Sequence, residues 1–331
     1  MNNIYRLYSL AIFCLCSLAG CAPAVTPKPT NAVTFSPTPT HTPLQATETA
    51  TATRSPTATS TLIPSPTPIT TARFAVIGDF GEAGETLQAV ADIVLSWEPD
   101  FIITTGDNNY PDGEAATIDA NVGQYFHEYI FPYVGQYGDG AQENLFFPTL
   151  GNHDWNTNNA QPYLDYFSLP GNERYYDFVW GPVHLFSIDS DSREPDGIGR
   201  SSIQAAWLNE ALAESSSPWK IVYTHLPPFS SGQHGSQLAL QWPFQEWGAS
   251  MVISGHDHDY ERLEIDSFPY FVNGLGGSSV RYYFKETISG SQVRYRLMSG
   301  AMLVEARSNQ IQLSFVNIAG EIIDTYSLTQ E

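Results

Sequence analysis

The chain has 331 residues, of which 42% are hydrophobic and 13% aromatic, enough apolar surface for a large buried core. Beyond residue 72 it carries 11 Lys and Arg against 34 Asp and Glu, a net charge of −23. Nucleic acid is therefore excluded as an expected partner, because an acidic surface repels phosphate backbones.

The first 21 residues are typical of an export signal. Arg6 precedes a short apolar stretch, LYSLAIFCLCSL, which is too short to span a bilayer permanently. The stretch ends in LAGC at residues 18–21, which resembles the lipobox of bacterial lipoproteins, where the cysteine is lipidated and becomes the mature N-terminus. We therefore predict an exported, cell-surface lipoprotein attached to the membrane only through a lipidated Cys21. The alternatives are an ordinary signal peptide, which would give a secreted protein, and an uncleaved anchor.

Residues 22–72 have the composition of a disordered linker. Between Ala22 and Thr71, 10 Pro and 16 Thr occupy 26 of 50 positions. Proline removes backbone donors and favours polyproline II, so the stretch, when extended, reaches roughly 150 Å at about 3.1 Å per residue. We predict that the linker holds a catalytic domain of residues 73–331 away from the membrane.

From residue 73 onward, strands and helices are predicted to alternate. Five apolar runs that end in polar residues are typical of buried strands: RFAVIGD (73–79), FIITTGD (101–107), LFFPTLGNHD (145–154), WKIVYTH (219–225) and ASMVISGHDH (249–258). Three segments have helical spacing of apolar residues: ETLQAVADIVLSW (85–97), SIQAAWLNEALAES (202–215) and QLALQWPFQEWG (237–248). This alternation indicates α/β layers with a substantially parallel sheet. Between Tyr270 and Leu328 the pattern shows no helix, so antiparallel strands are expected to finish or flank the sheet.

Each of these predicted strands ends in a side chain of a kind that binds metals. The endings are Asp79, Asp107, Asn152 with His153, His225, and the pair His256 and His258. Sites form beyond the carboxyl ends of strands in α/β sheets, so these residues are expected to converge. Carboxylates, imidazoles and an amide suit iron, zinc or manganese, and there are more ligands than one ion needs. Two ions about 3.5–4 Å apart that share a carboxylate are equipped to hydrolyse a phosphate ester.

Five short blocks resemble, in their order, those of the calcineurin-like metallophosphoesterases. They are GDFG (78–81), GDNNY (106–110), GNHD (151–154), the histidine of THLPP at 225, and GHDH (255–258). More narrowly, the blocks resemble those of the purple acid phosphatases. Most of the wider superfamily has a D-x-H first block, whereas this chain has Phe80 and Gly81 there, and it has Tyr110 in a D-x-x-Y second block. The resemblance covers residues 73–275 and implies a four-layer αββα sandwich of mixed sheets flanked by helices.

The resemblance also implies seven metal ligands and two cofactor ions. Asp79, Tyr110 and His258 would bind Fe(III), Asn152, His225 and His256 would bind a divalent ion (iron, zinc or manganese), and Asp107 would bridge the two. A phenolate favours Fe(III), because a hard trivalent ion best stabilises its charge. His256 and His258, one residue apart, would approach two adjacent ions from one loop.

Two further histidines are left for the substrate. His234 follows His225 by nine residues, a separation also found in purple acid phosphatases, where the later histidine lines the phosphate pocket. A protonated imidazole there would stabilise phosphate oxygens or protonate the leaving alkoxide. His153 is suited to the same work, with Asp154 orienting its ring. The sequence leaves open which of the two is the general acid.

The predicted activity is acid phosphatase-like: hydrolysis of phosphate monoesters by attack of a metal-bound hydroxide. No covalent enzyme intermediate is needed, and all three cysteines, Cys14, Cys16 and Cys21, precede the predicted domain. Two alternatives stay open. One is a phosphodiesterase or nucleotidase on the same scaffold, and the other is a tethered module that binds phosphate or metal without turnover.

Overall fold

The computed structural model describes residues 69–330. The predicted export signal, Cys21 and almost all of the predicted linker lie outside these residues. The first strand, β1 (Thr71–Ile77), already begins at Thr71, slightly before the predicted domain start at residue 73. Among the helices of the described part, none combines the length and hydropathy needed to cross a bilayer. Lipidation of Cys21 and the role of the linker therefore stay predictions.

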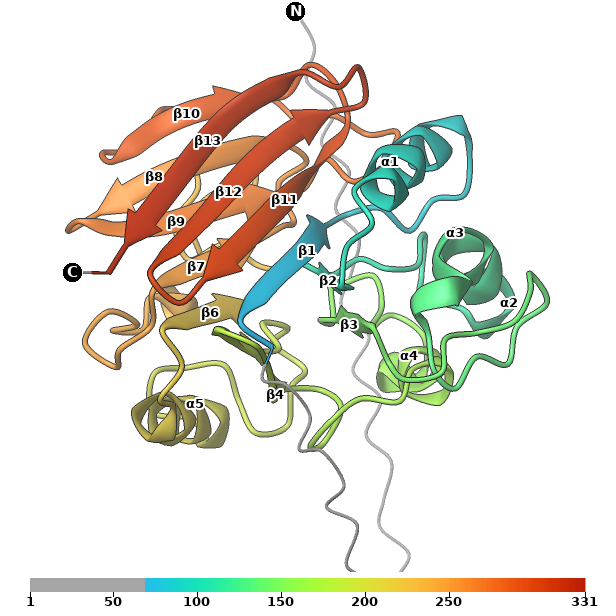
Figure 1. The fold of residues 1–331 in the computed structure, drawn as a ribbon, viewed down its shortest axis with the longest axis horizontal. Helices are drawn as coiled ribbons and strands as arrows, with labels where there is room; N and C mark the ends of the chain where they lie inside the picture. Colours follow the sequence, from blue (N-terminus) through green and yellow to red (C-terminus); the bar gives the residue numbers. More distant parts are fainter. Residues whose placement is uncertain (1–68, 331) are drawn as a thin grey trace, which may run out of the picture. The chain divides into compact units, whose positions relative to one another are not determined.

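The strands of residues 69–330 form two mixed sheets (Figure 1). In spatial order, the first sheet contains β13 (Ile322–Thr329), β12 (Gln310–Asn317), β11 (Gly300–Arg307), β1, β2 (Phe101–Thr104) and β3 (Phe146–Pro148). The second contains β10 (Ser291–Tyr295), β8 (Tyr260–Ile265), β9 (Phe268–Asn273), β7 (Met251–Ser254), β6 (Trp219–Tyr223), β5 (Val183–Ser187) and β4 (Tyr176–Trp180). The parallel strands are β1 to β3 in one sheet and β5, β6, β7 and β9 in the other. As predicted for the stretch up to Leu328, β10 to β13 are antiparallel and flank them. β9 at the start of that stretch differs, because it pairs in parallel with β7, and the antiparallel strands β4 and β8 were not predicted.

The two sheets share one apolar layer. Along β6, Ile221 and Tyr223 belong to this layer, whereas Val222 between them packs with α5 (Ile203–Glu214) on the opposite face of the sheet. Rings meet across the layer, where Tyr260 of β8 stacks on Phe315 of β12 with centroids 4.3 Å apart. The central strands are thus buried on both faces, which is why the sequence shows continuous apolar runs there instead of alternation.

Helices cover the outer faces of the sheets, and the predicted αββα fold class is confirmed. α1 (Glu85–Ser96) packs against the first sheet and α5 against the second (Figure 1), both close to their predicted bounds. The sequence did not predict the short elements, which are α2 (Ala115–Ile118), η1 (Asp119–Gly123), α3 (Gln124–Phe126), η2 (His127–Tyr129), η3 (Asn158–Ala160) and α4 (Gln161–Tyr166).

The helix predicted over residues 237–248 is wrong. The segment forms one short helical element, η4 (Leu238–Leu240), and a separate turn in which the amide of Trp247 donates to the carbonyl of Pro243 at 3.0 Å. Pro243 has no amide hydrogen and its ring clashes with the preceding turn, so a helix cannot continue through it. Three of the segment's apolar residues, Leu240, Trp242 and Phe244, are nevertheless buried, and they pack against the outer face of the second sheet.

Phe101 on β2 is the centre of an aromatic cluster. Its ring stacks on Phe74 at 4.7 Å and meets Phe178 edge-on at 5.5 Å. Phe101→Ala is expected to lower the free energy of unfolding by about 3–5 kcal/mol, because it removes a fully buried ring and leaves a cavity. Urea unfolding measures the change. Phe131→Ala is the matched control, since Phe131 is 45% exposed; a loss of the same size in the control would contradict the prediction.

Candidate metal centre

The structure brings the seven predicted ligand residues together at the carboxyl ends of strands from both sheets. The ends of β1, β2 and β3 lead to Asp79, Asp107 with Tyr110, and Asn152, while β6 and β7 of the second sheet lead to His225, His256 and His258. The site therefore lies where the parallel strands of two facing sheets end, and each sheet supplies part of the ligand set.

The first group of donor atoms surrounds the Tyr110 hydroxyl. This oxygen lies 3.1 Å from Oδ2 of Asp107, 3.5 Å from Oδ1 of Asp79 and 3.2 Å from Nε2 of His258. Nε2 of His258 lies in turn 3.5 Å from Oδ1 of Asp79. Side chains from three separate segments, Asp79, Asp107 with Tyr110, and His258, thus place one donor atom each around a common point.

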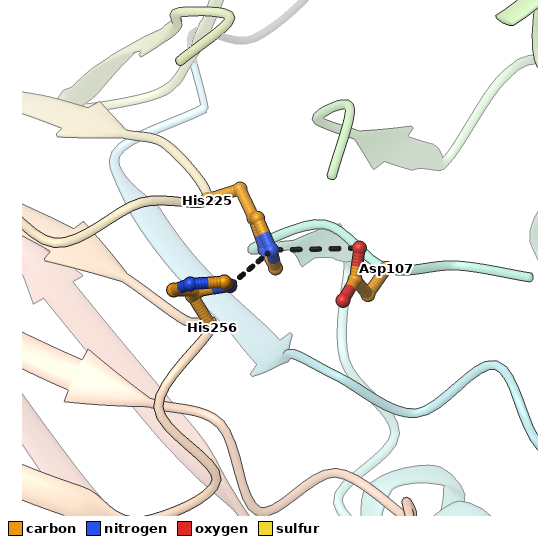
Figure 2. A group of neighbouring side chains, drawn as sticks. All are labelled: Asp107, His225 and His256. Atoms are coloured by element: carbon orange, nitrogen blue, oxygen red, sulfur yellow. Dashed lines mark hydrogen bonds and ion pairs between the residues drawn. The ribbon is translucent and has the colours of Figure 1, made fainter. Parts of the chain in front are cut away.

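The second group surrounds Nε2 of His225. This nitrogen lies 2.9 Å from Oδ1 of Asn152, 3.1 Å from Nδ1 of His256 and 3.4 Å from Oδ1 of Asp107. Figure 2 shows the side chains of Asp107, His225 and His256 pointing toward one another from three separate loops. Asp107 belongs to both groups, because Oδ2 faces Tyr110 while Oδ1 faces His225.

Backbone carbonyls hold the rings of two of these histidines. Nδ1 of His225 lies 2.8 Å from the carbonyl oxygen of Thr105, and Nδ1 of His258 lies 3.0 Å from that of Val280. A carbonyl only accepts, so each Nδ1 donates its hydrogen and each Nε2 presents a lone pair to its group in the neutral ring. In the second group, His225, Asn152 and Asp107 then each direct a lone pair toward the others. No hydrogen atom lies between these three acceptors to form a hydrogen bond. A metal cation stabilises such an arrangement, so the donor set fits metal binding.

The charge states of two of these residues, His256 and Asp107, also suit a metal. Burial, together with the neighbouring His225 and His234, lowers the pKa of His256 to about 3, so its ring is neutral near pH 7. Burial works against ionisation of Asp107, but His225 and His153 outweigh it and hold the pKa of this carboxyl below its ordinary value. A neutral imidazole and an ionised carboxylate are the forms in which these side chains bind metals.

Three of the ligand residues have a left-handed backbone, with φ of 55° at Asp79, 52° at Asp107 and 70° at His256. This conformation is uncommon outside glycine and costs of order 1–3 kcal/mol at a non-glycine residue. Close packing adds a further requirement, because a β-carbon on Gly106 would lie 2.7 Å from Nδ1 of His225. The fold therefore maintains strain at the turns that aim these side chains into the site.

His153 and His234 both lie beside the ligand groups. The backbone amide of His153 donates to Oδ1 of Asp107 at 2.9 Å, and its ring lies 4.6 Å from that of Tyr110. The ring of His234 lies 4.2 Å from that of His256. The side chains of both histidines are about one-third exposed, so both are placed to reach a substrate bound at the ligand groups.

Asp154 does not orient the ring of His153, so the predicted role is corrected. Its carboxylate accepts from the backbone amides of Gly151 and Asn108, at 2.9 and 3.1 Å, and from Nδ2 of Asn108 at 2.8 Å. Nδ1 of His153 contacts the carbonyl of Pro111 instead. Through these hydrogen bonds, Asp154 links the turn that carries Asn152 to the turn that follows Asp107.

Asp154→Ala is expected to lower the free energy of unfolding by about 2–4 kcal/mol. The carboxylate is buried, and its loss leaves the amides of Gly151 and Asn108 without their acceptor, at about 1–3 kcal/mol each. Urea unfolding of the metal-free chain measures the effect. Asp165→Ala is the control, because Asp165 is exposed and accepts a hydrogen bond from Gln161 within α4; losses of equal size would contradict the assignment.

Several residues around the site were missed by sequence reasoning, among them Asp257, Val280 and Tyr282. Oδ1 of Asp257 accepts from the backbone amide of His234 at 2.8 Å and lies 3.0 Å from its Nδ1. Val280 supplies the carbonyl that holds His258, and the ring of Tyr282 packs against His234 and His258. The position of Asp257 within GHDH is the one available signal. Val280 and Tyr282 follow β9 in a segment without a recognisable motif.

Comparisons with known proteins agree with this geometry. The family profile described as "Calcineurin-like phosphoesterase" matches residues 72–260. Purple acid phosphatase 3 of Arabidopsis thaliana is 24% identical over 311 residues, 78% of each chain. Tartrate-resistant acid phosphatase type 5 of Rattus norvegicus is 25% identical over 309 residues, which cover 79% of this chain and 91% of the relative.

Two solved structures share the fold. The purple acid phosphatase PPD1 from yellow lupin seeds has a TM-score of 0.63 and 18% identity, covering 79% of this chain and 54% of that one. GAP50, described as the anchor in the inner membrane complex of Plasmodium, has a TM-score of 0.61 and 21% identity, covering 79% of this chain and 89% of that one. Proteins with different described roles therefore share this arrangement of sheets.

Proposed function

The chain belongs to the calcineurin-like phosphoesterase family, and we propose that it hydrolyses phosphate monoesters at a binuclear metal centre of the purple acid phosphatase type. The family and the acid phosphatase relatives make it a metal-dependent phosphoric ester hydrolase. The preference for monoesters, the number of metal ions and their identity are the proposed part.

The placement of Asp107 is the observation that carries this proposal. Its two carboxylate oxygens face different groups of donor atoms, one around Tyr110 and the other around His225. A carboxylate so placed suits two ions that share it. When bound, such ions would acidify a water molecule and take up charge on the phosphoryl group.

The remaining residues have roles that follow from their positions. We assign Asp79, Tyr110 and His258 to Fe(III), and Asn152, His225 and His256 to a divalent iron, zinc or manganese ion. Beside them, His153 and His234 would contact phosphate oxygens and give a proton to the leaving oxygen. Asp257 accepts from the backbone amide of His234 and faces its Nδ1, so Nε2 is the nitrogen that is left for the substrate.

We also propose that this activity lies outside the cell. The Thr/Pro-rich residues 22–72 would tether the domain to a lipidated Cys21, as the LAGC segment suggests. Partition of the expressed protein into a detergent phase tests this, because Cys21→Ala should move the protein to the aqueous phase. Aqueous partition of the unaltered chain would favour the secreted form.

Turnover of two matched substrates tests the proposed activity. The metal-loaded full chain is expected to hydrolyse 4-nitrophenyl phosphate with a kcat/KM at least tenfold above that for bis(4-nitrophenyl) phosphate, with two metal ions bound per chain. Preference for the diester would identify the phosphodiesterase alternative instead. Absence of turnover with both substrates in a metal-loaded protein would favour a module that binds phosphate or metal without catalysis.

A further inference from the structure

Residues 278–299, here called the 278–299 segment, lie beside the proposed catalytic residues. The carbonyl of Val280 contacts Nδ1 of His258 at 3.0 Å. Two residues later, the ring of Tyr282 lies 4.6 Å from the ring of His258, and it meets His234 edge-on at 4.8 Å. Tyr282 is itself partly exposed. Its ring thus borders both a proposed metal ligand and a proposed substrate histidine, and part of it faces solvent.

The charge of this segment is opposite to that of the domain. It contains four of the 11 basic residues beyond residue 72, Arg281, Lys285, Arg294 and Arg296, and the single acidic residue Glu286. Among residues 69–330, none of these four pairs with a carboxylate, whereas Arg73, Arg174, Arg193 and Arg262 all do. Unpaired cations in an acidic protein attract anions to their neighbourhood.

Two of these cations lie close to the residues that follow Tyr282. The guanidinium carbon of Arg296 lies 4.4 Å from the ring centroid of Tyr283, and that of Arg294 lies 5.7 Å from the ring centroid of Phe284. The positive charge is therefore held near the chain that carries Tyr282. An anionic substrate drawn to this charge would meet the Tyr282 ring beside the site.

We propose that Tyr282 determines specificity for the leaving group, by receiving a planar aromatic group of the phosphate ester against its ring. This inference rests on the proposed function, because it places the phosphate at the ligand groups and beside His234. With His234 as the proton donor to the leaving oxygen, the leaving group would extend past His234 toward the ring of Tyr282, which lies 4.8 Å from that of His234. Aromatic rings stack favourably on such a surface, whereas an alkyl group gains less from it.

Two substrates that differ in their leaving groups test this proposal. Tyr282→Ala is expected to lower kcat/KM for phenyl phosphate about tenfold and that for glycerol 2-phosphate less than twofold. Tyr282→Leu, which keeps apolar bulk against His258, should give the same pattern, and Tyr282→Phe should retain the wild-type preference. Tyr283→Ala is the matched control, because Tyr283 is 68% exposed and packs with Arg296; its preference should not change.

A nucleoside 5′-monophosphate tests whether the aromatic group that contacts Tyr282 can be a nucleobase or only the aryl group of a short ester. A comparable loss with this substrate would extend the subsite to nucleobases, and a loss confined to phenyl phosphate would limit it to short aryl esters. Equal losses for phenyl phosphate and glycerol 2-phosphate would overturn the proposal, because Tyr282 would then only support the histidines. Unchanged selectivity in both Tyr282→Ala and Tyr282→Leu would overturn it as well.

Binding measurements separate this inference from the proposed activity. Calorimetry of the metal-loaded chain should show that Tyr282→Ala weakens phenylphosphonate binding about tenfold and methylphosphonate binding less than twofold. This comparison stands even if the unaltered chain hydrolyses no ester, in which case the proposed function fails and the subsite is still tested. Equal weakening of both phosphonates would overturn the subsite alone.

Discussion

Asp107→Ala is expected to lower kcat/KM for phosphate ester hydrolysis on the order of 10³-fold or more, because metal centres contribute several kcal/mol to such reactions. Asp107 contributes an oxygen to each donor group and also accepts the backbone amide of His153 at 2.9 Å. The substitution therefore removes a ligand from both proposed ions and releases one of the two substrate histidines. No other residue among the seven ligands faces both groups.

Activity and metal content should fall together in Asp107→Ala. The variant is expected to bind fewer than two ions per chain by elemental analysis, with its fold retained in circular dichroism. Asp139→Ala serves as control, because Asp139 is an exposed aspartate and should keep both activity and metal. Hydrolysis at the wild-type rate in Asp107→Ala would refute the shared role of this carboxylate.

Tyr110→Phe is expected to abolish the visible absorption band of the iron-loaded protein. Burial, reinforced by Asp107 and Asp79, raises the pKa of the Tyr110 hydroxyl well above its ordinary value, so the proton leaves only if a stronger cation takes its place. Fe(III) is such a cation, and a phenolate bound to it absorbs visible light by charge transfer. Phenylalanine keeps the ring but has no oxygen to bind iron.

The absorption spectrum of Tyr110→Phe has to be compared with the iron content of the same sample. We expect the band to vanish even in samples that retain iron, while affinity for the ferric ion falls by at least the roughly 10- to 100-fold that loss of a mere outer-shell partner costs. Tyr283→Phe is the matched control, because its hydroxyl is on an exposed side chain and should leave the band unchanged. A band that persists in Tyr110→Phe would assign it to another ligand and remove Tyr110 from the proposed set.

The backbone strain at the ligand turns links these predictions to the fold. Asp79, Asp107 and His256 keep a left-handed backbone, and each of their turns follows a central parallel strand. A strained turn persists only where the surrounding structure overdetermines it. The buried strands supply that support, so single changes at the ligands should alter metal binding far more than they alter the fold.

Local patterns along the chain identify the residues that end the central strands. An apolar run followed by a ligand-type side chain is a local pattern, and Asp79, Asp107, Asn152, His225 and His256 all follow strands in the structure. The same local reasoning predicted α1 and α5 from apolar spacing. It failed over residues 237–248, where Pro243 prevents the helix that the neighbouring apolar residues suggested.

The way in which these strand ends meet depends on long-range packing. The division of the parallel strands between two sheets depends on pairings between distant segments, which local periodicity does not record. The same long-range arrangement places the Asp154 side chain against Asn108. It also packs the ring of Tyr282 against His234 and His258. The end of a strand is encoded in a short stretch of sequence. A site built from two sheets forms only when those stretches pack together in the folded chain.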